Sequence, residues 1–133
     1  VIIDCGGRDT ASLRAALTLS DKFIVPFQPK SFDLWTINQI EKLVEEAKQV
    51  NPNLQTYSFI NCGGHTGKDN EEAIKILKQF ASIKVIPVVV GIRKAFSNAT
   101  AEGLSITELK PFDKKACTEM QTLYKHIYNK KYI

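Results

Sequence analysis

The sequence contains no long hydrophobic run, and no apolar stretch approaches the ~20 residues that a membrane-spanning helix needs. Cysteine is scarce and odd in number, with Cys5, Cys62 and Cys117 spread widely along the chain. This usage argues against a disulfide framework and predicts reduced thiols in a cytosolic compartment. A Gly-x-Ser-x-Gly motif is also lacking, which removes the main sequence support for a serine hydrolase.

The chain has the composition of one ordinary globular domain. It has 133 residues, of which 44% are hydrophobic and 24% charged, and it contains no internal repeat or linker. We therefore expect a single domain over residues 1–133.

The net charge of +4 is concentrated after Leu109, where six basic residues face only two acidic ones, Asp113 and Glu119. Such a segment predicts contact with nucleic acid phosphates or another anionic surface. The alternative is a solvated helix end whose lysines favour the helix dipole. The basic residues are Lys110, Lys114, Lys115, Lys125, Lys130 and Lys131.

Strands and helices are predicted to alternate along the whole chain, with a further extended stretch at residues 105–109. This alternation predicts an α/β fold with a doubly wound, mostly parallel sheet covered on both faces. The expected strands are residues 1–4, 23–26, 56–61 and 85–90, and the expected helices are 10–19, 33–50, 69–81, 93–101 and a last one from about 111. Pro87 interrupts the fourth strand and predicts an irregular or edge position.

Ligands of such folds bind at the carboxyl ends of the strands. The predicted strand ends therefore place a set of polar residues along one rim of the sheet. The set comprises Asp4, Cys5, Gln28, Asn61, Cys62 and the segment 87–93.

The first residues, Val1-Ile2-Ile3-Asp4, are typical of a buried strand that ends in a carboxylate, and the turn Cys5-Gly6-Gly7 follows. A carboxylate in this place can hold magnesium directly or through water, whereas its plainer role would be to cap the next turn. The phosphate-binding loop that such an acid serves is not found before it. We therefore expect either a piece of a larger protein or a fold that has lost its phosphate site.

The segment from Cys62 to Asp69 contains three glycines and a lysine between a strand and a helix, but it does not match a phosphate-binding loop. Only three residues separate Gly63 from Gly67, and Asp69 stands where Ser or Thr would reach magnesium. Asp69 and Glu72 instead predict a capping box for the helix.

Other side chains have plainer expected roles. Cys62 and His65 could form a zinc site with Cys5, but no fourth ligand is evident and zinc is not expected. His126 is expected on the surface of the last helix. Phe32 and Trp35, at the start of the long helix, are expected to pack in the core or in an interface.

Several stretches in fixed order resemble one protein family. They are Val1–Asp9, Ala16–Asp21 leading into Phe23–Pro29, Phe32–Trp35, Phe59–Asn61, and Arg93–Phe96 with Ala99, Gly103 and Glu108. Together they resemble the ParA/MinD family of deviant Walker ATPases, and especially the ParA-type proteins of DNA partition. The resemblance covers nearly the whole chain.

The resemblance implies an ATP- and magnesium-binding fold of the P-loop NTPase type that dimerises around two nucleotides. Asp4 matches the magnesium-binding Walker B aspartate, which acts through water. Asn61 matches the residue that reads adenine, and Pro87 lies near the segment that lines the base. Gly6, Gly7 and Arg8 match the switch segment, and Arg93 and Lys94 match part of a non-specific DNA surface.

The sequence departs from the family because the Lys-Gly-Gly-x-Gly-Lys-Thr loop and its strand are absent. The chain is therefore expected to be the C-terminal part of a ParA-type ATPase, incomplete at the N-terminus and not catalytic alone. The alternative is a non-catalytic binding module that kept the ParA-like fold.

The resemblance also implies partners and a location. The expected partners are a second copy of the protein, non-specific DNA, a ParB-like adaptor and the missing N-terminal segment, without a membrane. The implied location is the nucleoid of a bacterial-type cytoplasm.

Overall fold

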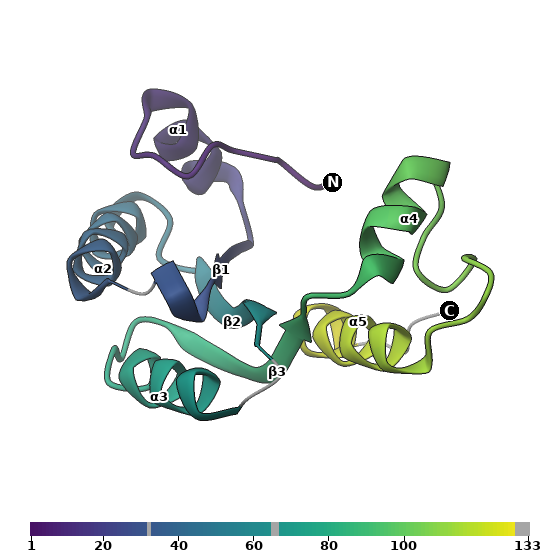
Figure 1. The fold of residues 1–133 in the computed structure, drawn as a ribbon. Helices are drawn as coiled ribbons and strands as arrows, with labels where there is room; N and C mark the ends of the chain where they lie inside the picture. The colour runs from purple at the N-terminus through teal and green to yellow at the C-terminus, as the bar shows by residue number, and fades with distance from the viewer. Residues whose placement is uncertain (32, 65–66, 130–133) are drawn as a thin grey trace.

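A computed structural model describes residues 1–31, 33–64 and 67–129. Its centre is a parallel sheet of three strands in the order β1-β2-β3 (Figure 1). β1 is Lys22–Phe27, β2 is Gln55–Gly63 and β3 is Lys84–Gly91. The predicted α/β fold with a parallel sheet is therefore confirmed.

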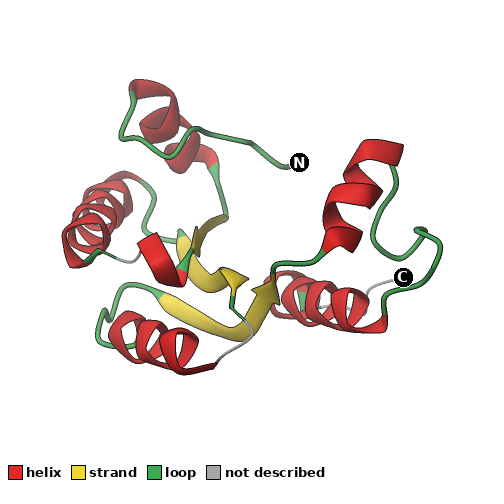
Figure 2. Ribbon diagram, viewed as in Figure 1, coloured by secondary structure: helices red, strands yellow, loops and turns green. Residues whose placement is uncertain are grey.

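Five α-helices accompany these strands in the described part of the chain (Figure 2). A short 3-10 turn at Pro29–Ser31 follows β1. The helices are α1 (Ala11–Leu19), α2 (Leu34–Val50), α3 (Gly67–Leu77), α4 (Lys94–Glu102) and α5 (Lys114–Tyr128).

The two faces of β2 are covered by different helices. Ile60 packs with Ile37 of α2 and Leu77 of α3, whereas Phe59 packs with Leu123 of α5. Successive side chains of a strand point to opposite faces, so the neighbouring residues Phe59 and Ile60 belong to two different cores. Figure 1 shows α2 and α3 on one side of the sheet and α5 on the other, which confirms the doubly wound arrangement.

The predicted helix starts agree with capping residues in the structure. Thr10 Oγ1 accepts a hydrogen bond from the backbone N–H of Leu13 at 3.2 Å, and Asp33 caps α2 through the N–H of Trp35 at 2.9 Å. Asp113 caps α5 in the same way. These side chains satisfy N–H groups that have no partner inside the helix.

The predicted strand at residues 1–4 is wrong. Residues 1–10 form neither helix nor strand, and Val1, Ile2 and Ile3 are all exposed. A strand needs a neighbour that accepts its backbone hydrogen bonds, but β1 pairs with β2 and the first residues run near α1, off the sheet (Figure 1). Only Cys5 of this segment joins a cluster, against Leu13 and Leu17.

Two other expectations are corrected. α3 begins at Gly67, so Asp69 lies inside its first turn and is not the predicted cap. Residues 105–109 form a turn rather than an extended stretch, because the Glu108 N–H bonds to the Ser105 carbonyl at 3.1 Å. Trp35 is 68% exposed and lies outside the core, so its packing in an interface stays a prediction. Phe32, its predicted companion, lies outside the described residues.

Pro87 has the predicted effect on β3. This strand lies at an edge of the described sheet, and its register with β2 shifts between Ser58 and Ile60. Proline cannot donate to a ladder, so the pairing skips around it. None of the helices in residues 1–31, 33–64 and 67–129 combines the length and hydrophobicity needed to cross a bilayer.

Gly63 closes β2 where the strand approaches β3 most tightly. A Cβ built there would lie 2.2 Å from Cγ1 of Val89, which is far inside van der Waals contact. Val89 is β-branched and sits within a strand, so its side chain has little freedom to move aside. The glycine is required by this close approach.

We predict that Gly63→Ala lowers the free energy of unfolding by about 1–3 kcal/mol, the usual cost of overpacking a core. Gly64→Ala is the matched control, because no atom lies within 4 Å of a Cβ at that exposed position. Urea unfolding of the two variants measures the difference. Equal stability of both would show that β2 and β3 do not approach as described.

Candidate functional site

The carboxyl ends of the three parallel strands meet at one edge of the sheet. Gln28 follows β1, Asn61 and Cys62 lie in the last residues of β2, and Arg93 follows β3. Asn61 is half-buried and pairs in register with Val90. The structure therefore brings these predicted rim residues to one edge.

The end of β2 has an unusual backbone. Cys62 has a φ of 53°, in the left-handed region that residues with a side chain rarely adopt. The turn beyond it is held by Asn70 of α3, whose Nδ2 donates to the carbonyl of Gly64 at 3.2 Å. The Oδ1 of Asn70 is buried and has no hydrogen-bond partner among the described residues. Strained backbone and unpaired buried polar groups are concentrated at functional sites.

The predicted magnesium and switch residues precede α1. Asp4, Gly6, Gly7 and Arg8 are exposed and belong to the N-terminal segment without regular structure. No atom lies within 4 Å of a Cβ built at Gly6 or Gly7. The role of these residues as a switch stays a prediction.

The described residues do not by themselves fit a magnesium ion bound to phosphates. No group of three or more His, Cys, Asp or Glu side chains among them could hold a metal ion. Asp4 is a single exposed carboxylate, whereas phosphoryl transfer needs positioned phosphate donors as well.

An ion-pair network that sequence reasoning missed fixes the chain just after the predicted switch segment. Arg14 donates to both carboxylate oxygens of Asp9 at 2.7 Å and to Glu46 of α2 at 2.7 Å. The hydrogen bonds from Arg14 lower the pKa of Asp9 and those to both acids raise the pKa of Arg14. The three side chains are roughly half exposed, so this network orients the segment more than it stabilises the fold.

Arg93 is held by Glu119 of α5. Its Nε and NH2 donate to the two carboxylate oxygens of Glu119 at 3.0 and 2.5 Å, and the Gly91 N–H donates to the same carboxylate at 3.2 Å. Both side chains are about four-fifths buried, and the hydrogen bond to Glu119 raises the pKa of Arg93. The fork geometry of such a pair makes it specific as well as strong. Glu119 thereby fastens the end of β3 to α5.

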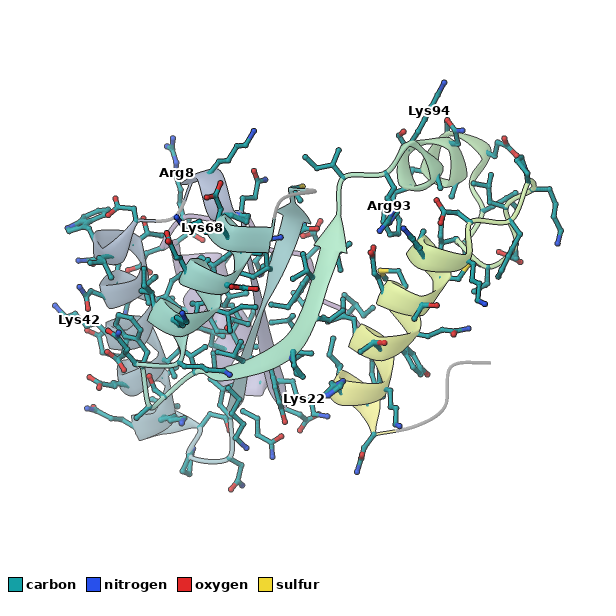
Figure 3. The ribbon with its side chains drawn as sticks, turned by 60° about the horizontal axis from the view of Figure 1, so that its bottom comes forward. Arg8, Lys22, Lys42, Lys68, Arg93 and Lys94 are labelled. Carbon is teal, nitrogen blue, oxygen red and sulfur yellow. The ribbon has the colours of Figure 1, made fainter. Side chains whose placement is uncertain are left out.

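The other predicted DNA-binding residue points elsewhere. Figure 3 shows Lys94 projecting from the start of α4 into solvent, whereas Arg93 is turned toward α5. Nearby, a groove of about 420 Å³ between α4 and the start of α5 is lined by Lys114, Lys115 and the half-exposed ring of Phe112. Exposed lysines thus surround a groove that Arg93 does not enter.

Pro87 is exposed in the middle of β3, between the buried residues Ile86 and Val88. It therefore lies before the carboxyl edge of the sheet. The resemblance places Pro87 near the segment that lines the base. Its role in nucleotide binding stays a prediction.

No family model matches this sequence. It is 23% identical over 128 residues to the maintenance of carboxysome distribution protein A of Halothiobacillus neapolitanus (strain ATCC 23641 / c2). The match covers 96% of the chain and 59% of the length of that relative. The chain is a distant homologue of this carboxysome-distribution protein. The likeness supports a ParA-like protein in general.

We predict that Glu119→Ala lowers the free energy of unfolding by about 1–3 kcal/mol, because it leaves a largely buried guanidinium and the Gly91 N–H without their partner. Glu46→Ala is the control, since it removes an acid from the half-exposed network around Arg14 and should cost at most about 1 kcal/mol. Urea unfolding compares the two variants. An equal or larger loss in Glu46→Ala would contradict the structural role of Glu119.

Proposed function

We propose that this chain is part of a ParA-like ATPase that positions a cargo inside the cell. The observation that carries the proposal is the match of 96% of the chain to a protein of carboxysome distribution. The parallel α/β sheet agrees with the P-loop NTPase type of fold that the resemblance implies. Partition of plasmid or chromosomal DNA is one form of this role.

Adenine recognition is assigned to Asn61 in this proposal. Its amide offers both a hydrogen-bond donor and an acceptor, as the edge of adenine requires. The residue is half-buried near the carboxyl end of the central strand, where ligands of parallel sheets bind. The unpaired Oδ1 of Asn70 and the left-handed Cys62 lie in the same part of the fold.

Phosphate and magnesium binding require more than the described residues. We propose that a loop outside these 133 residues holds the phosphates and that Asp4 joins it when the switch segment reorganises. The magnesium ion would then neutralise phosphate charge. The chain alone is accordingly not expected to hydrolyse ATP.

The prediction for Asn61→Ala is an ATP affinity of the intact protein weakened by about 1–3 kcal/mol, because buried polar groups lose their partner. Equilibrium binding of labelled ATP, with GTP as competitor, measures the effect. Gln28→Ala is the control, because Gln28 is an exposed residue of the same rim and has no assigned contact with the base. Unchanged ATP affinity in Asn61→Ala would remove this residue from the site, as would equal affinity of the wild type for GTP.

DNA binding is proposed for the surface formed by Lys94, Lys114 and Lys115, with Arg93 beside it. Lys114 and Lys115 line the groove between α4 and α5 beside Asp113 and carry part of the basic excess found after Leu109, and Lys94 begins α4. Contact with phosphates by such residues is independent of sequence and depends steeply on salt. A homodimer formed around ATP would double the contacts and strengthen binding.

For this surface, Lys94→Ala should weaken binding of the intact, ATP-bound protein to mixed-sequence duplex and reduce the salt slope by about 1. Lys42→Ala is the control, because Lys42 is exposed on α2 and lies far from Lys94 in Figure 3. Arg93→Ala and Glu119→Ala are measured in the same DNA-binding assay. If Arg93 contacts phosphates, Glu119→Ala tightens binding by releasing the guanidinium.

Binding that is flat between low and moderate salt would place the DNA surface elsewhere. The same conclusion follows if Lys94→Ala and Lys42→Ala bind alike. The lysines at the start of α5 would then be a solvated helix face.

The alternative function is a non-catalytic binding module with the same fold. ATP turnover by the intact protein separates the two. Turnover that depends on Asp4 supports the ATPase, whereas its absence in the presence of DNA and a ParB-like adaptor supports the module.

A further inference from the structure

A polar pocket lies at the opposite edge of the sheet from the candidate nucleotide site. It has a volume of about 350 Å³ and lies between the end of α2, the amino-terminal ends of β2 and β3, and the loop before β3. Its lining includes two lysines and no acid. Lys48, Thr56 and Ser82 contribute the side chains that the inference rests on.

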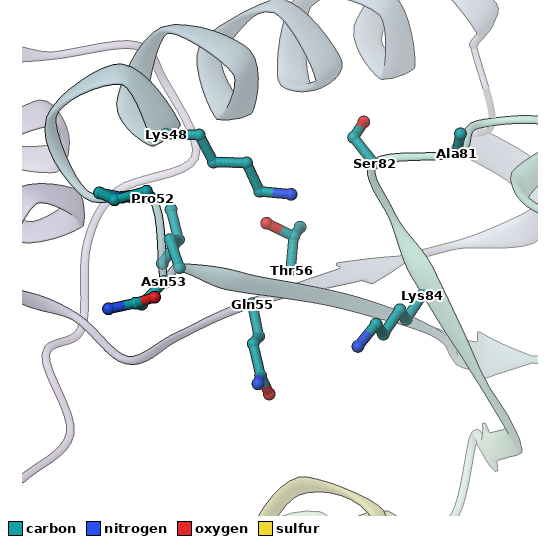
Figure 4. Close-up of a pocket in the computed structure, with 9 residues that line it drawn as sticks. Lys48, Pro52, Asn53, Gln55, Thr56, Ala81, Ser82 and Lys84 are labelled. Atoms are coloured by element: carbon teal, nitrogen blue, oxygen red, sulfur yellow. The ribbon is translucent and has the colours of Figure 1, made fainter.

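The deepest polar group of this pocket is the hydroxyl of Thr56. Thr56 is 1% exposed, and its Oγ1 is buried without a hydrogen-bond partner among the residues that the structure describes. A buried hydroxyl left unpaired costs about 1–3 kcal/mol. Figure 4 shows this oxygen turned toward the space beneath the side chain of Lys48.

Lys48 supplies the positive charge. It belongs to the last turn of α2, where a cation is favoured by the helix dipole, and its ammonium group reaches over Thr56 into the pocket (Figure 4). Gln55 and Lys84 point to the other side of the strands in the same view, so the charge of Lys84 acts only at the margin.

Ser82 limits the chemistry of the pocket. Its hydroxyl donates to Oε1 of Glu41 at 2.9 Å, so its proton is already engaged. The donors that face this space in Figure 4 are therefore the ammonium of Lys48 and the hydroxyl of Thr56, and an ammonium has no acceptor. A ligand that satisfies both must offer acceptors, ideally with a negative charge.

We propose that this pocket is a second binding site, which takes a small oxyanion through Lys48 and Thr56. The oxyanion is a phosphate or a carboxylate group, which present acceptor oxygens to both donors. The site is separate from the proposed nucleotide site, because the amino-terminal ends of parallel strands lie at the edge opposite their carboxyl ends.

The test uses the intact protein without ATP or magnesium, titrated with inorganic phosphate or with acetate at constant ionic strength. Chemical shifts of the backbone amides of residues 54–56 and 81–84 report binding. Wild type and the control Lys42→Met, on the same helix but outside the pocket, should give saturable shifts. Saturation by phosphate identifies a phosphate site, and tighter saturation by acetate identifies a carboxylate site.

Lys48→Met and Thr56→Val should each weaken binding by about tenfold or more, the loss expected for one charge-assisted hydrogen bond. Thr56→Ser keeps the hydroxyl and should bind as the wild type does. If Thr56→Val unfolds, Lys48→Met alone decides the test. Two results would overturn the site. One is the lack of a saturable shift with either anion, and the other is binding that persists unchanged in both Lys48→Met and Thr56→Val.

Discussion

Pairing of β2 with a parallel neighbour on each side is the constraint on which the rest of the structure depends. Its backbone bonds to β1 along one edge and to β3 along the other, and its two faces form parts of two separate cores. The strand ends bring Asn61 near Arg93, and the strand start places Thr56 beneath Lys48. Gly63 is the position where this constraint is tightest, because a side chain there would collide with Val89.

Much of the fold could be predicted from the sequence because local signals and the hydrophobic period agree. The long helix that ends at Val50 has an apolar stripe and a capping aspartate, and β1 is apolar throughout after Lys22. The strand predicted at residues 1–4 was wrong because the apolar character of these residues gives no information about a neighbouring strand, which a β-strand needs. The predicted start of α3 was wrong because the capping-box pattern of Asp69 and Glu72 occurs by chance inside the helix.

The candidate site was harder to predict than the fold, because its contacts join residues far apart in the chain. Arg93 was predicted as a DNA contact, but its bond to Glu119 spans 26 positions that no local pattern connects. The structure gives this pair a role in holding α5 to β3. A buried Asn70 and a left-handed Cys62 likewise leave no readable signal in the sequence.

The most direct test of the central claim compares how much DNA the intact protein retains in three states: with ATP, with ADP and without nucleotide. A ParA-like positioning ATPase should bind mixed-sequence duplex with ATP and lose most of that binding in the other two states. Equal retention in all three states would contradict the claim, because DNA binding would then be independent of the nucleotide that the fold is proposed to read.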